Sequence, residues 1–184
     1  MDQSKLFITC STVAEIEDAA SWTNTSYDWP QTQFDELCSA VGQALVAWAA
    51  LERWLFAIYM ASLQSASPNS ASSIWDIQTG FRMRLNMTHE SLLKNHNLAI
   101  NANKWEKLKD RCRKKSLRRN ALAHGTMFYE HSNKSLSKRF FIATIKTTGP
   151  LEPRIHTSDA LSFRDAFISI SEELRLFHLS IKTA

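Results

Sequence analysis

The stretch that decides the fold is "FDELCSAVGQALVAWAALERWLFAIYMASL", residues 34–63. It is too long for a strand, and its apolar residues recur at three- and four-residue steps, as they do on one side of a helix. That side carries Leu37, Val41, Leu45, Trp48, Leu55 and Tyr59. A second side carries Ala47, Leu51, Trp54 and Ile58. A helix that is apolar on nearly all sides lies in the centre of a bundle, so we expect a buried central helix.

Two further helices are expected after this one. The serine-rich segment 64–73 indicates a loop. A helix is then predicted over residues 74–96, although Gly80 weakens it by roughly 1 kcal/mol. Its apolar face comprises Ile74, Ile77, Phe81, Leu85 and Leu92. A third helix is predicted from near Ala102 to His124.

The period of the sequence changes after His124. The segments "TMFYEH" and "KRFFIATIKT" are rich in β-branched and aromatic residues and predict a β-hairpin at about 126–147. "SFRD", residues 162–165, resembles a capping box and predicts the start of the last helix. The apolar face of that helix comprises Phe163, Phe167, Ile170, Leu174, Phe177 and Ile181.

These elements predict an all-α fold, a bundle of about four helices with a small β-hairpin inserted before the last one. Residues 34–184 form this helical domain, and residues 1–33 form an N-terminal extension whose aromatic residues Trp22, Tyr27 and Trp29 dock on it. The three cysteines lie far apart, which favours a reducing compartment over a disulfide framework. The apolar run "LFITC" is too short for a signal peptide. No apolar run approaches the ~20 residues of a membrane span, so we expect a soluble cytoplasmic protein without membrane contact.

The predicted third helix carries most of the positive charge. Residues 104–120 hold nine Lys and Arg against Glu106 and Asp110, so the local charge is nine minus two, or +7, whereas the whole chain is +4. A run of charge is often only a solvated face. The alternative is a patch that binds RNA through Lys114, Lys115 and Arg118, because clustered cations together neutralise a phosphate backbone.

Helical phase separates the two neighbouring arginines at the end of this helix. At about 100° per residue, Arg119 falls within about 20° of Cys112 on the buried face, whereas Arg118 points outward. An inward guanidinium requires an anionic partner, and Glu52 lies on an apolar face of the central helix. Glu52 and Arg119 therefore form either a structural ion pair or the border of a polar pocket or subunit junction.

His124 follows Asn120 by four residues and Arg119 by five. On one straight helix His124 and Arg119 are therefore about 140° apart and cannot share a stripe. Either the helix ends at His124, or the two side chains converge through a bend or across a dimer. Gly125 favours a helix end, where His124 either caps the helix or serves in proton transfer.

The hexapeptide "RNALAH", residues 119–124, resembles the R-x4-6-H motif of the HEPN superfamily, including the polar residue directly after the arginine. The central helix with "ALERWL" and the order of the helices around it are similar too. The resemblance covers residues 34–184, although the hairpin lies outside the minimal four-helix HEPN pattern.

The resemblance implies a metal-independent endoribonuclease that acts as a toxin or in defence or stress responses. It assigns His124 as general base or acid for attack of the ribose 2′-OH, Arg119 as the phosphate ligand, and Asn120 as the residue that positions the substrate or the histidine. The products would carry 2′,3′-cyclic phosphate and 5′-hydroxyl ends. Glu52 matches a frequently acidic position and takes a supporting role. Two protomers would pair into a homodimer with one composite site.

Other chemistries have little support in the sequence. No HExxH, Walker loop, GxGxxG or GxSxG occurs, and His89 and His96 lack a third nearby ligand, so we expect no metal or other cofactor. Some HEPN proteins have lost catalysis, so the alternative function is a non-catalytic dimeric interaction or RNA-binding module. In either case the resemblance allows an antitoxin or another regulatory protein as a partner.

Overall fold

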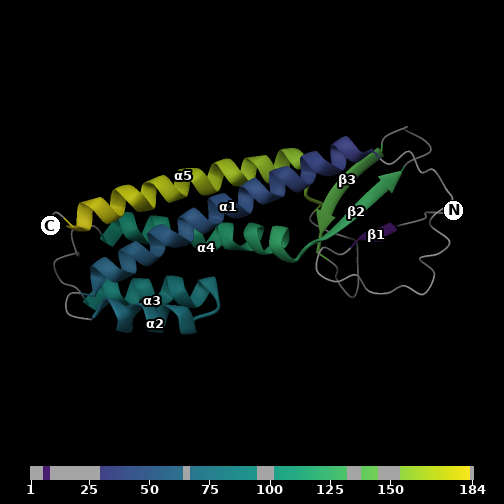
Figure 1. Ribbon diagram of the computed structural model, residues 1–184. Coiled ribbons are helices and arrows are strands. Elements are labelled where there is room, and N and C mark those ends of the chain that lie inside the picture. Colours follow the sequence, from purple (N-terminus) through teal and green to yellow (C-terminus); the bar gives the residue numbers. More distant parts are fainter. Residues whose placement is uncertain are drawn as a thin grey trace.

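The computed structural model describes residues 6–8, 30–63, 67–94, 102–131, 138–144 and 154–182. These residues form five helices and a three-stranded antiparallel sheet, shown in Figure 1. The helices are α1 (Gln31–Ser62), α2 (Pro68–Ile77), α3 (Phe81–Lys94), α4 (Ala102–His124) and α5 (Thr157–Lys182). The strands are β1 (Leu6–Ile8), β2 (Thr126–His131) and β3 (Lys138–Ala143).

Helix α1 is the central element, as its sequence predicts. Most residues on its two apolar sides are buried, and Val41, Leu45 and Trp54 are half-buried. Its main neighbour is α5, which runs parallel to it because both helices begin at the end of the bundle near the sheet (Figure 1). Trp48 of α1 joins the two helices through an edge-to-face contact with Phe167, with ring centroids 5.1 Å apart.

Helix α5 begins at Thr157, six residues before Phe163, the first helical residue that the "SFRD" capping box predicts. The helix begins earlier because the Asp159 carboxylate accepts a hydrogen bond from the His156 backbone N–H at 3.0 Å. This bond caps the N-terminus of the helix at His156. The predicted apolar face is confirmed. Phe167, Ile170, Leu174, Phe177 and Ile181 are buried, and Phe163 is half-buried.

The single helix predicted over residues 74–96 is wrong, because α2 and α3 are separate helices. Ser67 caps α2 by accepting a hydrogen bond from the Ser70 N–H, so part of the predicted loop is helical. Within α2 the buried residues are Ala71 and Trp75, whereas Ile74 and Ile77 are exposed. The sequence analysis placed these two residues on the apolar face because it continued one helical period across Gly80, where the structure has a break between two helices.

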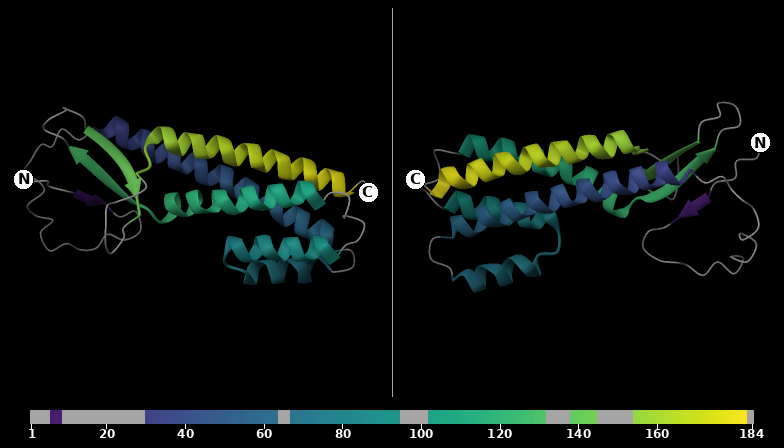
Figure 2. Two further views of the ribbon diagram at one scale, coloured as in Figure 1. Left: turned by 180° about the vertical axis from the view of Figure 1, so that it is seen from behind. Right: turned by 45° about the horizontal axis from the view of Figure 1, so that its top comes forward.

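The strands pack at the other end of the bundle from α2 and α3 (Figures 1 and 2). Strands β2 and β3 form the predicted hairpin, with Phe128 opposite Phe141 in the register. Strand β1 adds a third strand beside β2, which the sequence did not predict. The all-α fold with a hairpin before the last helix is confirmed. The docking of Trp22, Tyr27 and Trp29 and the turns of the two loops around β3 lie outside the described residues.

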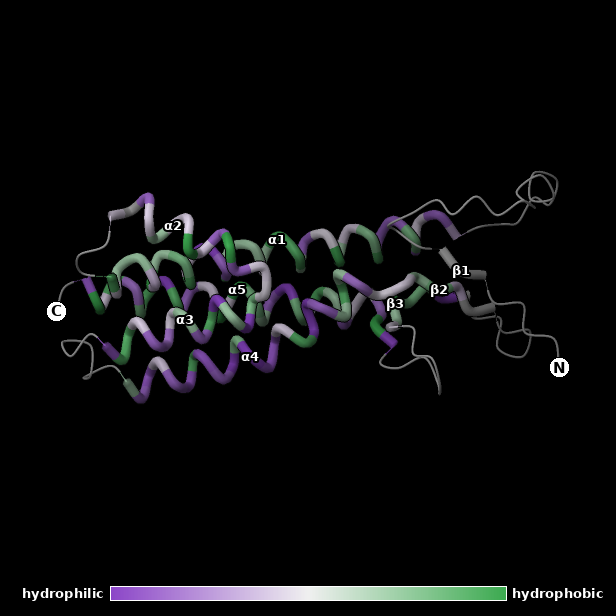
Figure 3. The backbone as a smooth tube through the Cα atoms, turned by 90° about the horizontal axis from the view of Figure 1, so that it is seen from below, coloured by the Kyte–Doolittle hydropathy of each residue, from purple (hydrophilic) through white to green (hydrophobic). Residues whose placement is uncertain are grey.

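Hydropathy distinguishes the two helices that matter most for function. Figure 3 shows α1 with long hydrophobic stretches and α4 as mostly hydrophilic. By length and composition α1 meets the requirements of a membrane-spanning helix, contrary to the expectation that no segment would. The observation is weak evidence, because the central helix of a water-soluble bundle meets the same requirements.

The fold predicts a pH-dependent stability through His178 of α5. Burial lowers the pKa of His178, and the nearby Lys182 charge lowers it further. Because the unfolded chain binds this proton more readily than the folded chain, stability is full above the unfolded pKa of about 6.5 and falls as the pH drops below it. We expect His178→Leu to weaken this dependence in urea unfolding measured on both sides of that pH. The exposed-site variant Leu176→Ala should keep the wild-type dependence, and equal pH slopes for all three proteins would contradict the assignment.

Candidate functional site

The candidate site starts from one half-buried carboxylate, that of Glu52 on α1. Its Oε1 accepts a hydrogen bond from the Trp48 indole N–H at 2.7 Å. Trp48 itself is fully packed, with its ring 4.6 Å from that of Phe81 of α3. Because the indole cannot move, it fixes the carboxylate on the side of α1 that faces α3 and α4.

Two guanidinium groups approach this carboxylate from different helices. Arg84 of α3 places Nη1 3.7 Å from Oε2 of Glu52. Arg119 of α4 places Nη2 4.0 Å from Oε1 of the same residue. The ion pair between Glu52 and Arg119 is therefore present, and the distances from both guanidinium groups to Glu52 are too long for a hydrogen bond. The Arg119 side chain remains 30% exposed, so Glu52 does not seal it from solvent.

Asn120 is the second side chain that contacts the Arg119 guanidinium. Nη1 of Arg119 donates a hydrogen bond to Oδ1 of Asn120 at 3.1 Å. Arg118 points away from this cluster and lies exposed, with its guanidinium 5.6 Å from the centre of the Phe163 ring. The separation of the two arginines predicted from helical phase is confirmed, and Asn120 contacts the arginine of the motif.

His124 is the last residue of α4 and is exposed. The prediction that the helix ends at this histidine is confirmed. In the described part of the chain no hydrogen bond or ion pair joins His124 to Arg119 or Asn120. One chain therefore brings Arg119, Asn120 and Glu52 together and leaves His124 outside this cluster.

Gly125 connects α4 directly to β2, and the connection has no space for a side chain. A Cβ at this position would lie 2.2 Å from Cγ2 of Ile142 and 2.4 Å from the backbone oxygen of Ala121. The glycine follows the helix as predicted, and the close approach of β3 explains why it is needed there. His124 is consequently anchored by the junction between α4 and the sheet.

The positive side chains of α4 occupy a flank of the helix different from that of the motif. Lys114 and Arg118 are one turn apart, as are Asn120 and His124, and the two pairs are about 120° apart around the helix. Lys114 and Arg113 both pair with Asp110, at 2.6 and 3.0 Å. Hydrogen bonds from Lys114 and Arg113 lower the pKa of the Asp110 carboxyl.

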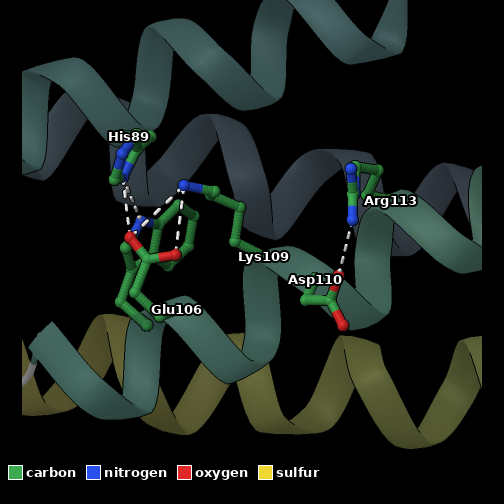
Figure 4. Close-up of polar contacts among 6 residues, drawn as sticks. His89, Glu106, Lys109, Asp110 and Arg113 are labelled. Atoms are coloured by element: carbon green, nitrogen blue, oxygen red, sulfur yellow. Dashed lines mark hydrogen bonds and ion pairs between the residues drawn. The ribbon is translucent and has the colours of Figure 1, made fainter.

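Such exposed pairs contribute little to stability and exchange easily for phosphate contacts. Figure 4 shows the pair of Asp110 and Arg113. Lys115 lies half-buried on the side of α4 nearer the core. Lys114 and Arg118 are therefore the more accessible two of the three predicted RNA-binding residues.

Of the other polar contacts in Figure 4, those of His89 join α3 to α4, and that of Lys109 with Glu106 lies within α4. The Trp105 indole donates a hydrogen bond to Nδ1 of His89 at 3.2 Å, and Glu106 lies 3.5 Å from the same atom. Lys109 pairs with Glu106 at 3.1 Å. These contacts give His89 a structural role between the helices. No group of three His, Cys, Asp or Glu side chains that could hold a metal ion occurs within the described ranges.

Arg84 and Trp48 are the residues of the cluster that the sequence analysis did not assign to the site. Trp48 lies four residues before Glu52, a spacing at which side chains meet on a helix, so this contact was readable from the sequence. Arg84 was not readable, because its position depends on the break between α2 and α3 and on the packing of α3 against α1.

A pocket of about 340 Å³ lies apart from this cluster, at the start of α1 and α5. It is lined by Gln33, Glu36, Arg139, Phe140, His156 and Thr157. None of the motif residues borders it. Its lining combines a carboxylate with a guanidinium and favours no single ligand class, so we place the candidate site at the charged cluster.

Comparison of the chain with protein-family models, with curated proteins and with solved structures finds no match.

The junction at Gly125 leads to a test of how His124 is held. We expect Gly125→Ala to lower the free energy of unfolding by about 1–3 kcal/mol, because the backbone oxygen of Ala121 cannot move aside without distorting α4. Gly42→Ala is the matched control, since Gly42 of α1 has open space around it. Chemical unfolding measures both variants, and equal stability of the two would show that the junction tolerates a side chain.

Proposed function

We propose that this protein is a metal-independent endoribonuclease of the HEPN type, which cleaves RNA by attack of the 2′-OH on the adjacent phosphate. The observation that carries the proposal is that the Arg119 guanidinium is partly exposed and makes no hydrogen bond to Glu52. Its guanidinium lies 4.0 Å from the Glu52 carboxylate, outside hydrogen-bond distance, and stays partly exposed on a basic helix that ends in an exposed histidine. A guanidinium held in this way suits a phosphate, which it binds through two parallel hydrogen bonds.

Each residue then has a distinct role. Arg119 binds the scissile phosphate and stabilises the charge that builds on it in the transition state. Asn120 orients Arg119 through the 3.1 Å hydrogen bond. His124 takes the proton from the 2′-OH or gives one to the leaving 5′ oxygen. Glu52 supports the position of Arg119, and the products are a 2′,3′-cyclic phosphate and a 5′-hydroxyl.

The separation of His124 from Arg119 supports a site shared by two chains. Helices α2 and α3 cover α1 and α4 only in the half away from the sheet (Figure 2). On α4, Leu117 is 70% exposed and lies within about 20° of His124 around the helix axis. An exposed apolar side chain beside the motif suits a two-fold interface, in which His124 of one protomer approaches Arg119 of the other.

The same chemistry suits a toxin or a defence or stress effector in the cytoplasm, because unregulated RNA cleavage harms the cell that contains it. Such a protein requires control by an antitoxin or another regulatory protein. RNA is the substrate in this proposal, and the exposed cations Lys114 and Arg118 bind its backbone together with Lys115.

A second candidate is a non-catalytic RNA-binding or dimerisation module. The observation in its favour is the 120° separation between the basic flank of α4 and the flank with Asn120 and His124, because a straight RNA strand on the basic flank does not reach the histidine. The two candidates differ in whether a cleaved product forms.

Cleavage is tested with purified protein and single-stranded RNA in the presence of EDTA. We expect cyclic-phosphate products from the wild type, and a loss of about 10²–10⁴-fold in rate for His124→Ala, because the proton-transfer group is removed. Asn103→Ala, an exposed substitution at the start of the same helix, is the control. Equal cleavage by His124→Ala and Asn103→Ala would overturn the assigned role, and a protein that binds RNA without cutting it would favour the second candidate.

The basic flank is tested by the salt dependence of RNA binding. We expect Lys114→Ala to weaken binding and to reduce the slope of log K against log salt by about 0.7, the value for one phosphate contact on a single strand. The half-buried Lys115 should show the same effect to a smaller extent in Lys115→Ala. Lys182→Ala at the end of α5 is the control, because it also removes one positive charge but lies outside α4. It should leave the slope at the wild-type value. Identical slopes for all three variants would show that α4 is only a solvated face.

A further inference from the structure

We propose that Arg84 is a positioning residue of this site, which keeps Glu52 from neutralising Arg119. By pairing with Glu52, Arg84 leaves the Arg119 guanidinium available to an anionic ligand. The inference rests on the proposed function in one respect only, that the ligand is an RNA phosphate. Arg84 itself is not placed in contact with RNA.

The two oxygens of Glu52 have different partners. Oε1 accepts the 2.7 Å hydrogen bond from Trp48 and has Arg119 at 4.0 Å. Oε2 has Arg84 at 3.7 Å. With one oxygen held by the indole and the other directed toward α3, the carboxylate cannot turn to meet the Arg119 guanidinium with both oxygens. Bidentate pairing, the strongest form of this contact, is thereby withheld from Arg119.

Arg84 depends on Glu52 more than Arg119 does. The Arg84 side chain is 22% exposed, its guanidinium lies 5.3 Å from the Trp75 ring centre, and its Nε is buried without a hydrogen-bond partner among the described residues. A cation in such surroundings strongly requires a counter-charge. Arg119 is 30% exposed and has Asn120 as a further partner, so it can exchange Glu52 for another anion.

The charges of the cluster do not balance. Among the described residues two guanidinium groups share one carboxylate, which leaves one positive charge where α1, α3 and α4 meet. Because Arg84 is the more buried cation, the surplus charge resides on the more exposed Arg119. Removal of Arg84 would balance the pair of Glu52 and Arg119 and remove that surplus.

The test compares Arg84→Gln, Arg84→Lys, Glu52→Gln and the double variant Arg84→Gln/Glu52→Gln. The readout is the affinity for a single-stranded RNA with 2′-O-methyl groups, which 2′-OH attack cannot cleave. We expect Arg84→Gln to bind about tenfold more weakly, since Glu52 then closes on Arg119. Arg84→Lys should restore most of the affinity, because an ammonium also holds the carboxylate. The double variant should bind as tightly as Glu52→Gln, because no carboxylate remains to occupy Arg119.

Two results would overturn the assignment. Wild-type affinity in Arg84→Gln would show that Glu52 does not compete for Arg119. A loss in Arg84→Gln that the double variant fails to recover would show that Arg84 supports the fold or contacts RNA directly. Thermal unfolding of each variant establishes that it is folded. If Arg84→Gln does not fold, Arg84→Lys carries the test, because a tenfold loss of affinity in this variant would also overturn the assignment.

Cleavage of unmodified RNA by the same proteins separates this inference from the proposed function. If the wild type binds the modified RNA and never cuts the natural form, the ribonuclease proposal fails, and the order of affinities still decides the role of Arg84. If the wild type does not bind the modified RNA, the role assigned to Arg84 is overturned as well.

Discussion

The burial of α1 is the constraint on which the site depends. This helix packs against α5 on one side and against α3 and α4 on another, so a carboxylate in its middle cannot remain surrounded by water. Glu52 is that carboxylate, and it is satisfied by the Trp48 indole and two guanidinium groups. Because burying an ion without partners costs several kcal/mol, the sequence of α1 requires a neighbouring helix to bring a cation to this level of the bundle.

The buried residues Trp105, Leu108, Cys112 and Leu122 set the rotation of α4, and the same rotation brings Arg119 to Glu52. With Arg119 turned toward α1, Asn120 and His124 lie on one outer flank, and Lys114 and Arg118 lie on another. Gly125 then ends the helix against β3, so His124 cannot be carried further around the axis. The rotation that brings Arg119 to the half-buried Glu52 thus also determines the flank on which the exposed His124 lies, although Glu52 and His124 do not touch.

The sequence predicted what depends on local periodicity. The length of α4, its end at His124 and the inward direction of Arg119 follow from apolar spacing and a glycine, and the structure agrees. The break at Gly80 was missed because the helical period on its two sides happens to continue, and the buried Trp75 replaced Ile74 and Ile77 on the inner face. Strand β1 and Arg84 were missed because both owe their places to tertiary packing, which no window of sequence contains.

The charge surplus at this junction is itself an argument for function. A bundle selected only for stability would carry one cation for Glu52, or an apolar pair, because replacing a buried ion pair with well-packed hydrophobic residues is often neutral or stabilising. Here a second guanidinium is retained at the same carboxylate, and Nε of Arg84 is left without a hydrogen bond within the described chain. Departures from local consistency of this kind concentrate where a protein binds or reacts. The surplus positive charge beside a basic helix therefore supports the proposal that this site binds a phosphate.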